Sequence, residues 1–588
     1  MGIPGRAWKY KKCFALAACK SNLYYLSMRN MTATIHGKSI TLPIGATVED
    51  VLVEAKIEET CSRLVYENNP IVGALVNHEL HSCTRSLVSD CTVEPVHLFG
   101  DMGKRIYRHS LCYLLCAAVS MLYPQRRLVI GHSLGDGYYF SFDDELTLRC
   151  DDILAIGQAM QSLVEQNLDI EEITLPYQSA LTYFEQNHFA QTAALLSTRN
   201  EPKVNLYRLK GYLDISYEPL LSKTGLMKVW ELKPYQERGM LLRYPRSHNI
   251  KSLDPFVDNP LLFSVFKEYK EWGSILGIQS LGQLNQMGNQ NTIESFIRLA
   301  EALQQKKIAS IADQINLHSS VKAVLIAGPS SSGKTTFAHK LGIQLQVLGK
   351  KTIKISLDSY YLPPSQAPKD EFNKPDLEAL EALDVTKFQE DLGSLFRGEA
   401  VRLCKFDFKT ATRSYEPEPV QMDKRTLLII EGIHGMNPQL TASMESNLLF
   451  RVYISALTQL NLDDHNRIST TDNRIIRRMI RDNRTRGTNA ETTLNMWPSV
   501  QRGEDRYIFP YQNNADVLIN SALDYELGVL TTYAQPLLKM VKPSAGAAYE
   551  TARRLLRFLE HVNPIPDTLV PPESLLREFI GGSEFDVV

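Results

Sequence analysis

The sequence predicts an α/β multidomain protein whose second half is built on a doubly wound parallel sheet. The chain has 588 residues, which at about 150 residues per domain gives a prior of roughly three to four domains. Continuous apolar runs, VKAVLIA at 321–327 and RTLLIIE at 425–431, are typical of strands that are buried on both faces. Shorter alternating runs before residue 100 indicate a small sheet with one solvated face.

Composition excludes several function classes. The 64 Lys and Arg residues nearly balance the 66 Asp and Glu residues, so the overall charge favours neither a nucleic-acid scaffold nor an anionic membrane as partner. The nine cysteines are irregularly spaced and form no CxxC pair, which suits reduced thiols in a cytoplasmic protein. No segment is long and apolar enough to be expected to span a bilayer.

Residues 1–30 raise a targeting question, because KYKKCFALAAC places lysines before an apolar run. The run from Cys13 to Ala18 is shorter than the roughly 7–15 apolar residues of a secretory signal. We expect a disordered extension, with Met31 as the functional start.

The stretch 31–98 reads as a small β-grasp unit. TATIHGKSITLP at 32–43 predicts a hairpin, and ATVEDVLVEA at 46–55 predicts a helix that begins with a capping box between Thr47 and Asp50. IVGALVN and VEPVHLF supply two further strands. The unit resembles the TGS domain found at the front of threonyl-tRNA synthetases and in some GTPases.

The region 99–250 resembles the α+β second additional, or editing, domain of threonyl-tRNA synthetase. The resemblance lies in RHSLCYLLCAAVSMLYP, IGHSLGDGYYFSF and YLDISYEPLLSKTG, in that order. In that family HxxxH and CxxxH landmarks form a site that can hold zinc, but the corresponding positions here are His109, Tyr113, Ser216 and Leu220. A tetrahedral site needs about four donors, so we expect a degenerate domain without editing chemistry. We expect Cys112 and Cys116, one helical turn apart, to be core residues.

Residues 251–318 predict a helical connector. PLLFSVFKEYKEWGSIL and TIESFIRLAEALQQKKIASIADQI carry apolar residues at helical spacing, and the intervening LGQLNQMGNQN is expected to be a polar loop.

The next segment, GPSSSGKT, fits the phosphate-loop pattern G-x-x-x-x-G-K-[ST]. The context supports a true phosphate loop, because the segment joins the apolar run VKAVLIA, a predicted strand, to TFAHKLGIQLQVLG, a predicted helix. Backbone N–H groups of such a loop cradle phosphates, Lys334 can reach the outer phosphate oxygens and Thr335 can ligate Mg²⁺. The expected nucleotide-binding residues are Gly328, Pro329, Ser330, Ser331, Ser332, Gly333, Lys334, Thr335 and Thr336.

Two acidic residues follow predicted strands of the same sheet. KTIKISL ends just before Asp358, and RTLLIIE ends in Glu431. Ligands of open α/β sheets bind at the carboxyl ends of the strands. A carboxylate there can accept a proton from a substrate hydroxyl, and another can hold Mg²⁺. We therefore expect Asp358 to be the base and Glu431 to lie in the metal shell.

An arginine-rich helix is predicted at TDNRIIRRMIRDNRTRG. Like charges three and four residues apart repel, and we expect a polyphosphate to relieve this repulsion under a mobile lid. A plain basic face that contacts RNA is the alternative. The arginines are Arg474, Arg477, Arg478, Arg481, Arg484 and Arg486.

Residues 319–588, and most specifically 319–540, resemble uridine kinase and its phosphoribulokinase relatives. The resemblance lies in GPSSSGKT, LDSYY, EFNKPDLEAL, FDFKTATR, LLIIEGIHG and the arginine segment. The order of the modules also resembles bacterial fused nucleoside kinases. The resemblance implies a P-loop kinase domain with ATP and Mg²⁺ as cofactors. By the same resemblance, the catalytic residues are Asp358, Lys334, Arg477, Arg478, Arg481 and Arg486, the metal residues are Thr335 and Glu431, and the substrate residues are Tyr361, Asn373, Phe406 and Phe408.

Two departures concern the substrate. Uridine kinases have an acidic residue where this chain has Asn373, and a histidine where it has Ala411. Loss of a buried hydrogen-bond partner can shift discrimination by orders of magnitude, so the resemblance does not fix uridine as the substrate.

We therefore predict ATP-dependent phosphorylation of the 5′-hydroxyl of a nucleoside. Another small alcohol is the alternative acceptor. An alternative hypothesis from a different functional class is a regulatory protein. Its amino-terminal half would bind RNA or a nucleotide, and its ATP site would act as a switch. The sequence leaves the oligomeric state and the choice of ATP or GTP open.

Overall fold

The computed structural model describes residues 30–57, 69–135, 137–144, 146–236, 238–245, 251–288, 290–371, 373–407, 410 and 412–585. Almost all of the predicted amino-terminal extension, and with it the expectation of disorder, lies outside the described residues. The chain divides into two compact units. The first comprises residues 1–190, 200–256 and 464–466, and the second comprises the remainder. No helix among the described residues is long and apolar enough to cross a membrane.

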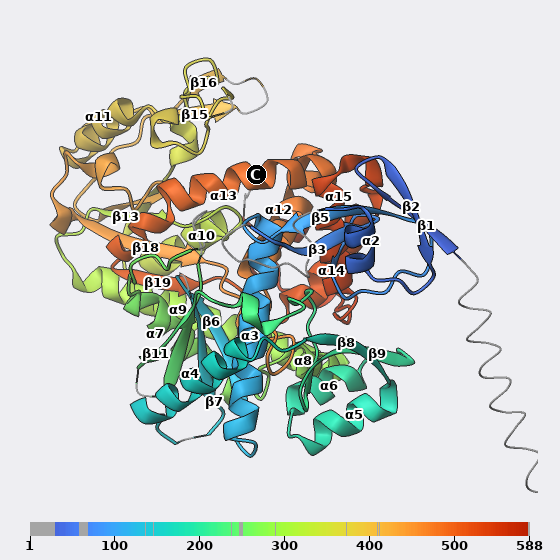
Figure 1. The fold of residues 1–588 in the computed structure, drawn as a ribbon. Helices are drawn as coiled ribbons and strands as arrows, with labels where there is room; N and C mark the ends of the chain where they lie inside the picture. Colours follow the sequence, from blue (N-terminus) through green and yellow to red (C-terminus); the bar gives the residue numbers. More distant parts are fainter. Residues whose placement is uncertain are drawn as a thin grey trace, which may run out of the picture. The chain divides into compact units, whose positions relative to one another are not determined.

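The first unit begins with a five-stranded sheet in the order β2-β1-β5-β3-β4 (Figure 1). The predicted hairpin is confirmed, and the predicted helix is confirmed together with its Thr47–Asp50 capping box. The fourth strand of this sheet, β4, was not predicted. The elements are β1 (Asn30–Ile35), β2 (Lys38–Pro43), α2 (Val48–Glu54), β3 (Ile71–Val76), β4 (Glu79–Ser82) and β5 (Cys91–His97).

The rest of the first unit packs helices against two antiparallel sheets, β11-β12-β7-β6 and β10-β9-β8. The long helix α3 is buried on every side from Ser110 to Val119, because apolar residues fill this stretch of the helix. Cys112 and Cys116 are buried residues of this helix, as predicted. The elements are α3 (Asp101–Leu122), β6 (Leu128–Leu134), β7 (Gly137–Phe142), α4 (Cys150–Glu165), β8 (Glu171–Pro176), α5 (Tyr177–Gln186), α6 (Ala190–Ser197), β9 (Lys203–Leu209), β10 (Tyr212–Asp214), η3 (Thr224–Leu226), β11 (Glu231–Tyr235) and β12 (Gly239–Arg243). Most of α6, from residue 191 on, belongs to the second unit.

The second unit opens with three helices, α7 (Pro260–Leu276), α8 (Leu281–Gln286) and α9 (Gln290–Leu317). The two long helices are confirmed. The expected polar loop between them is wrong in part, because Ser280 and Gln283 form a capping box that starts the short helix α8.

The core of the second unit is a five-stranded sheet in the order β14-β17-β13-β18-β19, and every pair of neighbouring strands is parallel. Helices α9 and α10 pack on one face of it around Phe337 and Leu341. The first strand along the chain, β13, lies in the middle, so the loop that follows it leaves the sheet where ligands of such folds bind. The sheet and its first helix comprise β13 (Ala323–Ala327), α10 (Lys334–Val347), β14 (Lys351–Ser356), β17 (Thr426–Glu431), β18 (Leu449–Ser455) and β19 (Val517–Asn520).

The remaining elements of the second unit surround this sheet. A hairpin and α11 lie together at the edge of the unit in Figure 1, and the arginine-rich segment forms one helix, α12, as predicted. The elements are η4 (Leu357–Tyr360), η5 (Leu380–Ala382), α11 (Val385–Phe396), β15 (Cys404–Asp407), β16 (Thr412–Tyr415), η6 (Pro438–Thr441), η7 (Ser446–Leu448), α12 (Thr470–Arg486), α13 (Ala490–Tyr507), η8 (Phe509–Asn514), α14 (Glu526–Met540), η9 (Pro543–Ala545), α15 (Ala547–Leu559), η10 (Asp567–Leu569) and α16 (Arg577–Ile580).

Candidate active site

The loop Gly328–Thr335 joins β13 to α10, which is the context that a phosphate loop requires. Its backbone turns tightly, with left-handed φ angles of 60° at Ser331 and 82° at Gly333. A Cβ atom on Gly328 would lie 1.9 Å from the carbonyl oxygen of Ile454 on β18, so only glycine fits there. The sequence thus folds the loop closely over the start of α10.

Polar groups of this loop are suited to an anion. The ammonium group of Lys334 donates to the carbonyl oxygens of Gly328 and Pro329, at 3.0 and 3.2 Å. The hydroxyls of Ser331 and Ser332 are buried and have no hydrogen-bond partner among the residues that the structure describes. Buried hydroxyls without a partner are uncommon, and phosphate oxygens would satisfy them. The loop therefore fits the nucleotide that the motif implies.

The two predicted acids lie near each other at the carboxyl edge of the sheet. Glu431 is the last residue of β17 and pairs in register with Ser356 of β14, whose hydroxyl donates to its carboxylate at 2.7 Å. Asp358 lies two residues further along, in η4. Arg413 holds this turn, since its guanidinium donates to the carbonyl oxygens of Tyr360 and Tyr361 at 3.1 Å.

Mutual repulsion and desolvation perturb these groups. Burial, followed by the charge of Asp358, raises the pKa of Glu431 to about 7, although Lys334 opposes the shift. Desolvation raises the pKa of Asp358, and Lys334, Arg486 and Arg481 oppose that shift. Burial lowers the pKa of Lys334, against the charges of Glu431 and Asp358. Perturbed carboxyls beside a lysine are typical of catalytic sites.

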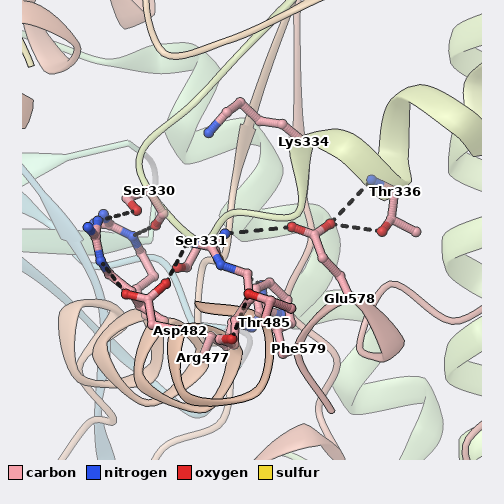
Figure 2. A network of polar contacts seen from close by, with 12 residues as sticks. Ser330, Ser331, Lys334, Thr336, Arg477, Asp482, Thr485, Glu578 and Phe579 are labelled. Atoms are coloured by element: carbon pink, nitrogen blue, oxygen red, sulfur yellow. Dashed lines mark hydrogen bonds and ion pairs between the residues drawn. The ribbon is translucent and has the colours of Figure 1, made fainter. Parts of the chain in front are cut away.

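Three arginines of α12 hold the phosphate loop, and Figure 2 shows Arg477 beside it. Arg474 donates to the carbonyl oxygen of Ser330 at 2.9 Å, Arg478 donates to the Ser330 hydroxyl at 2.8 Å, and Arg477 donates to the carbonyl oxygen of Ser331 at 3.3 Å. All three guanidinium groups are buried. Arg477 also forms an ion pair with Glu526, as Arg474 does with Glu504. These contacts hold the three arginines against the loop, and the mobile lid expected from the sequence stays a prediction.

Arg481 and Arg486 lie at the other end of α12 and interact electrostatically with Asp358. The Arg486 side chain is 55% exposed and that of Arg481 is 20% exposed. Both belong to the four arginines that the resemblance predicts to be catalytic, and that role stays a prediction.

Two carboxylates on the loop were missed by the sequence analysis. Glu504 of α13 accepts from the Ser330 amide at 3.0 Å. Glu578 of α16 accepts from the amide and hydroxyl of Thr336 at 3.2 and 2.8 Å (Figure 2). A single acid within a helix carries no local signal of its partner.

The predicted substrate residues are brought together only in part. Tyr361 is buried, and its ring centroid lies 6.3 Å from that of Phe406. Asn373 is exposed in a loop, with a left-handed φ of 60°. Phe408 and Ala411 lie outside the described residues.

A further acid, Glu378, was not predicted for this side of the site. It interacts electrostatically with Tyr361, Asp358 and Arg478. Burial raises the pKa of Glu378 to about 7, and Arg478 opposes the shift.

In the first unit the four positions of the editing landmarks lie in packed surroundings. His109 is half-buried within α3, Tyr113 donates to the carbonyl oxygen of Tyr207 at 2.8 Å, Ser216 donates to that of Glu218 at 2.6 Å, and Leu220 is buried. No group of three or more His, Cys, Asp or Glu residues that could hold a metal occurs in the described parts of the chain.

The buried His465 of this unit instead pairs with Asp214, at 2.7 Å. Burial alone would lower the pKa of His465, but interactions with Cys116 and Asp214 raise it well above the usual value.

The parallel sheet, the phosphate loop and the strand-end acids define the second unit as a P-loop phosphotransferase. Residues 323–527 match the model of the Phosphoribulokinase / Uridine kinase family. This part of the chain is a kinase domain of that family.

The amino-terminal region is similar to threonine–tRNA ligases. The chain is 27% identical over 158 residues to that of Acetivibrio thermocellus, a match that covers 27% of this chain and 25% of the ligase. It is 31% identical over 133 residues to that of Carboxydothermus hydrogenoformans, covering 22% of this chain and 21% of the ligase. The chain thus spans about a quarter of the length of these ligases.

Among solved structures, a possible uridine kinase from Bacillus stearothermophilus is 16% identical. The match covers 34% of this chain and 89% of that one, with a TM-score of 0.24. The D-glycerate 3-kinase from Cryptococcus neoformans is also 16% identical, covering 43% of this chain and 88% of that one, with a TM-score of 0.21. Similarity at this level says nothing of the substrate.

Proposed function

We propose that this protein transfers the terminal phosphate of ATP to the 5′-hydroxyl of a nucleoside. The observation that carries the proposal is the grouping of Lys334, Asp358 and Glu431 beside the phosphate loop, at the carboxyl edge of the sheet. A nucleotide switch needs a lysine and a metal ligand, but it has no use for a strand-end carboxylate that faces an acceptor.

Asp358 is the acceptor-side base. It orients the hydroxyl and takes its proton as the oxygen forms a bond to the phosphorus and the bond from that phosphorus to the departing nucleoside diphosphate breaks. Its raised pKa suits this role, because a base works best when its pKa approaches the operating pH. Lys334, Arg481 and Arg486 offset the negative charge on the transferring group.

The hydroxyl of Thr335 and the carboxylate of Glu431 fit Mg²⁺, which prefers oxygen ligands. When bound, Mg²⁺ neutralises charge on the donor phosphates. Glu431 is suited to a cation because burial and then the charge of Asp358 raise its pKa to about 7, and a bound cation would offset both effects.

A nucleoside is supported by the family of the kinase domain and by the aromatic pair Tyr361 and Phe406, which can pack on a base. The second candidate is another small alcohol. It is favoured by Asn373, an exposed amide at the position where uridine kinases have an acid. Glu378, close to Asp358 and Tyr361, can bind hydroxyl groups of either acceptor.

An RNA or nucleotide ligand for the amino-terminal half is the other part of the proposal. It is supported by the similarity to threonine–tRNA ligases. Binding of tRNA at physiological salt would test it, because phosphate contacts alone weaken steeply with salt.

The kinase proposal is tested by phosphate transfer from ATP to a panel of nucleosides and small alcohols. We expect one nucleoside to stimulate transfer and Asp358→Asn to lower kcat by about 10²–10⁴-fold. The matched control is Asp313→Asn, which removes an exposed carboxylate on α9. The proposal fails if no nucleoside is phosphorylated, or if Asp358→Asn and the control behave alike.

A further inference from the structure

The carboxyl-terminal segment around α16 is firmly fixed within the second unit. Leu575 is fully buried in the core beside α10. Arg484 of α12 donates to the carbonyl oxygens of Glu578 and Phe579 at 2.9 and 3.2 Å, and the guanidinium of Arg477 lies 4.8 Å from the Phe579 ring centroid. The backbone of Glu578 is therefore held in place, and its side chain is presented in a defined direction.

That side chain binds the first turn of α10 (Figure 2). The Thr336 amide and hydroxyl both donate to one carboxylate oxygen of Glu578, at 3.2 and 2.8 Å. Amides in the first turn have no partner within their own helix, and in a phosphate loop they are donors for the nucleotide. Glu578 is 7% exposed, so it holds a buried anion position on this helix.

Because the Glu578 carboxylate already binds Thr336, the negative charges of the site disfavour the binding of a second anion there. Glu578 interacts electrostatically with Lys334 and with Glu431, and its carboxylate lies 3.9 Å from Arg481. It is a third carboxylate in a site that already contains Asp358 and Glu431. A nucleotide triphosphate would bring more negative charge to the same cations and the same donors.

We propose that Glu578 is a built-in competitor of the phosphate donor and that nucleotide binding must displace its carboxylate from Thr336. The inference rests on the proposed ATP-dependent kinase activity. The carboxyl-terminal segment then helps to set the affinity of the protein for the phosphate donor, because a phosphate of the nucleotide replaces the Glu578 carboxylate at Thr336.

The experiment measures the Kd of ATP and of ADP by calorimetry, without acceptor, for the wild type, Glu578→Gln and Glu578→Ala. Glu578→Gln keeps the size and hydrogen-bonding capacity and removes only the charge. Charge-assisted hydrogen bonds are about twice as strong as neutral ones, so we expect the Kd of ATP to fall by about tenfold or more in both variants. Glu584→Gln, which removes an exposed carboxylate of the same segment, is the control and should match the wild type.

The steady-state KM for ATP should fall in parallel with the Kd. Unchanged or weaker ATP binding by Glu578→Gln, in protein with a native circular dichroism spectrum, overturns the inference while wild-type phosphate transfer leaves the kinase proposal standing. If neither the wild type nor any variant binds a nucleotide, both proposals fail. Tighter binding by the variants, but not by the control, supports the inference.

Discussion

Replacing Glu431 with glutamine should stabilise the protein while it abolishes activity. On folding, the pKa of this carboxyl rises from 4.5 to about 7, so the folded state binds a proton more tightly than the unfolded chain. The free energy of unfolding therefore falls as the pH rises from 4.5 to 7, and the whole of this loss remains above pH 7. At about 1.36 kcal/mol per pKa unit, this rise in pKa lowers the free energy of unfolding by slightly more than about 3 kcal/mol.

Glu431→Gln removes the charge and keeps an oxygen that can accept from the Ser356 hydroxyl. Part of this loss depends on the charge of Asp358, because the two carboxylates repel each other. We therefore expect the variant to be more stable than the wild type by about 1–3 kcal/mol at pH 8 and equally stable near pH 4.5. Phosphate transfer should fall at least about 100-fold, as expected when a group that holds charge in the transition state is lost.

The assay is urea denaturation of both proteins at several pH values without Mg²⁺, followed by circular dichroism. Glu390→Gln, an exposed carboxyl on α11, is the control and should show no pH-dependent difference. Two results would refute the reasoning. One is a variant that is less stable than the wild type at pH 8, and the other is a difference that does not shrink as the pH falls.

Four further predictions concern the loop and its supports. Asp358→Asn should lower kcat without weakening ATP binding, which separate kinetic and calorimetric measurements would check. Arg477→Met should destabilise the protein by about 3–5 kcal/mol, because it leaves Glu526 buried and unpaired, whereas Arg486→Gln should leave the denaturation midpoint unchanged and lower kcat. Gly328→Ala should abolish ATP binding, since the added methyl group must displace the loop; calorimetry showing wild-type affinity would contradict this.

Local patterns predicted much of the fold. The capping box at Thr47, the phosphate loop and the strand ends at Asp358 and Glu431 are each encoded within a few residues, and the structure has the corresponding elements. Helix α8 was missed because its capping box lies in a polar, glutamine-rich segment that lacks apolar periodicity. Glu504 and Glu578 could not be found in this way, since their partners lie 174 and 242 residues away in the chain.

Carboxylates of the protein relieve part of the repulsion among the arginines of α12. Repulsion among its arginines suggested a polyphosphate ligand, but Arg474 and Arg477 each have their own carboxylate, Glu504 and Glu526. This half of α12 is therefore neutralised by the protein and supports the loop.

The other half of α12 is compensated less completely. Arg478, Arg481 and Arg486 share the single carboxylate of Asp482, at 3.3, 3.6 and 3.2 Å. One negative charge cannot balance three positive ones, although the carboxyl-terminal end of a helix favours cations. Glu578, 3.9 Å from Arg481, offsets part of the excess. The remaining positive charge faces Asp358, which is where charge develops when a phosphate moves to an acceptor hydroxyl.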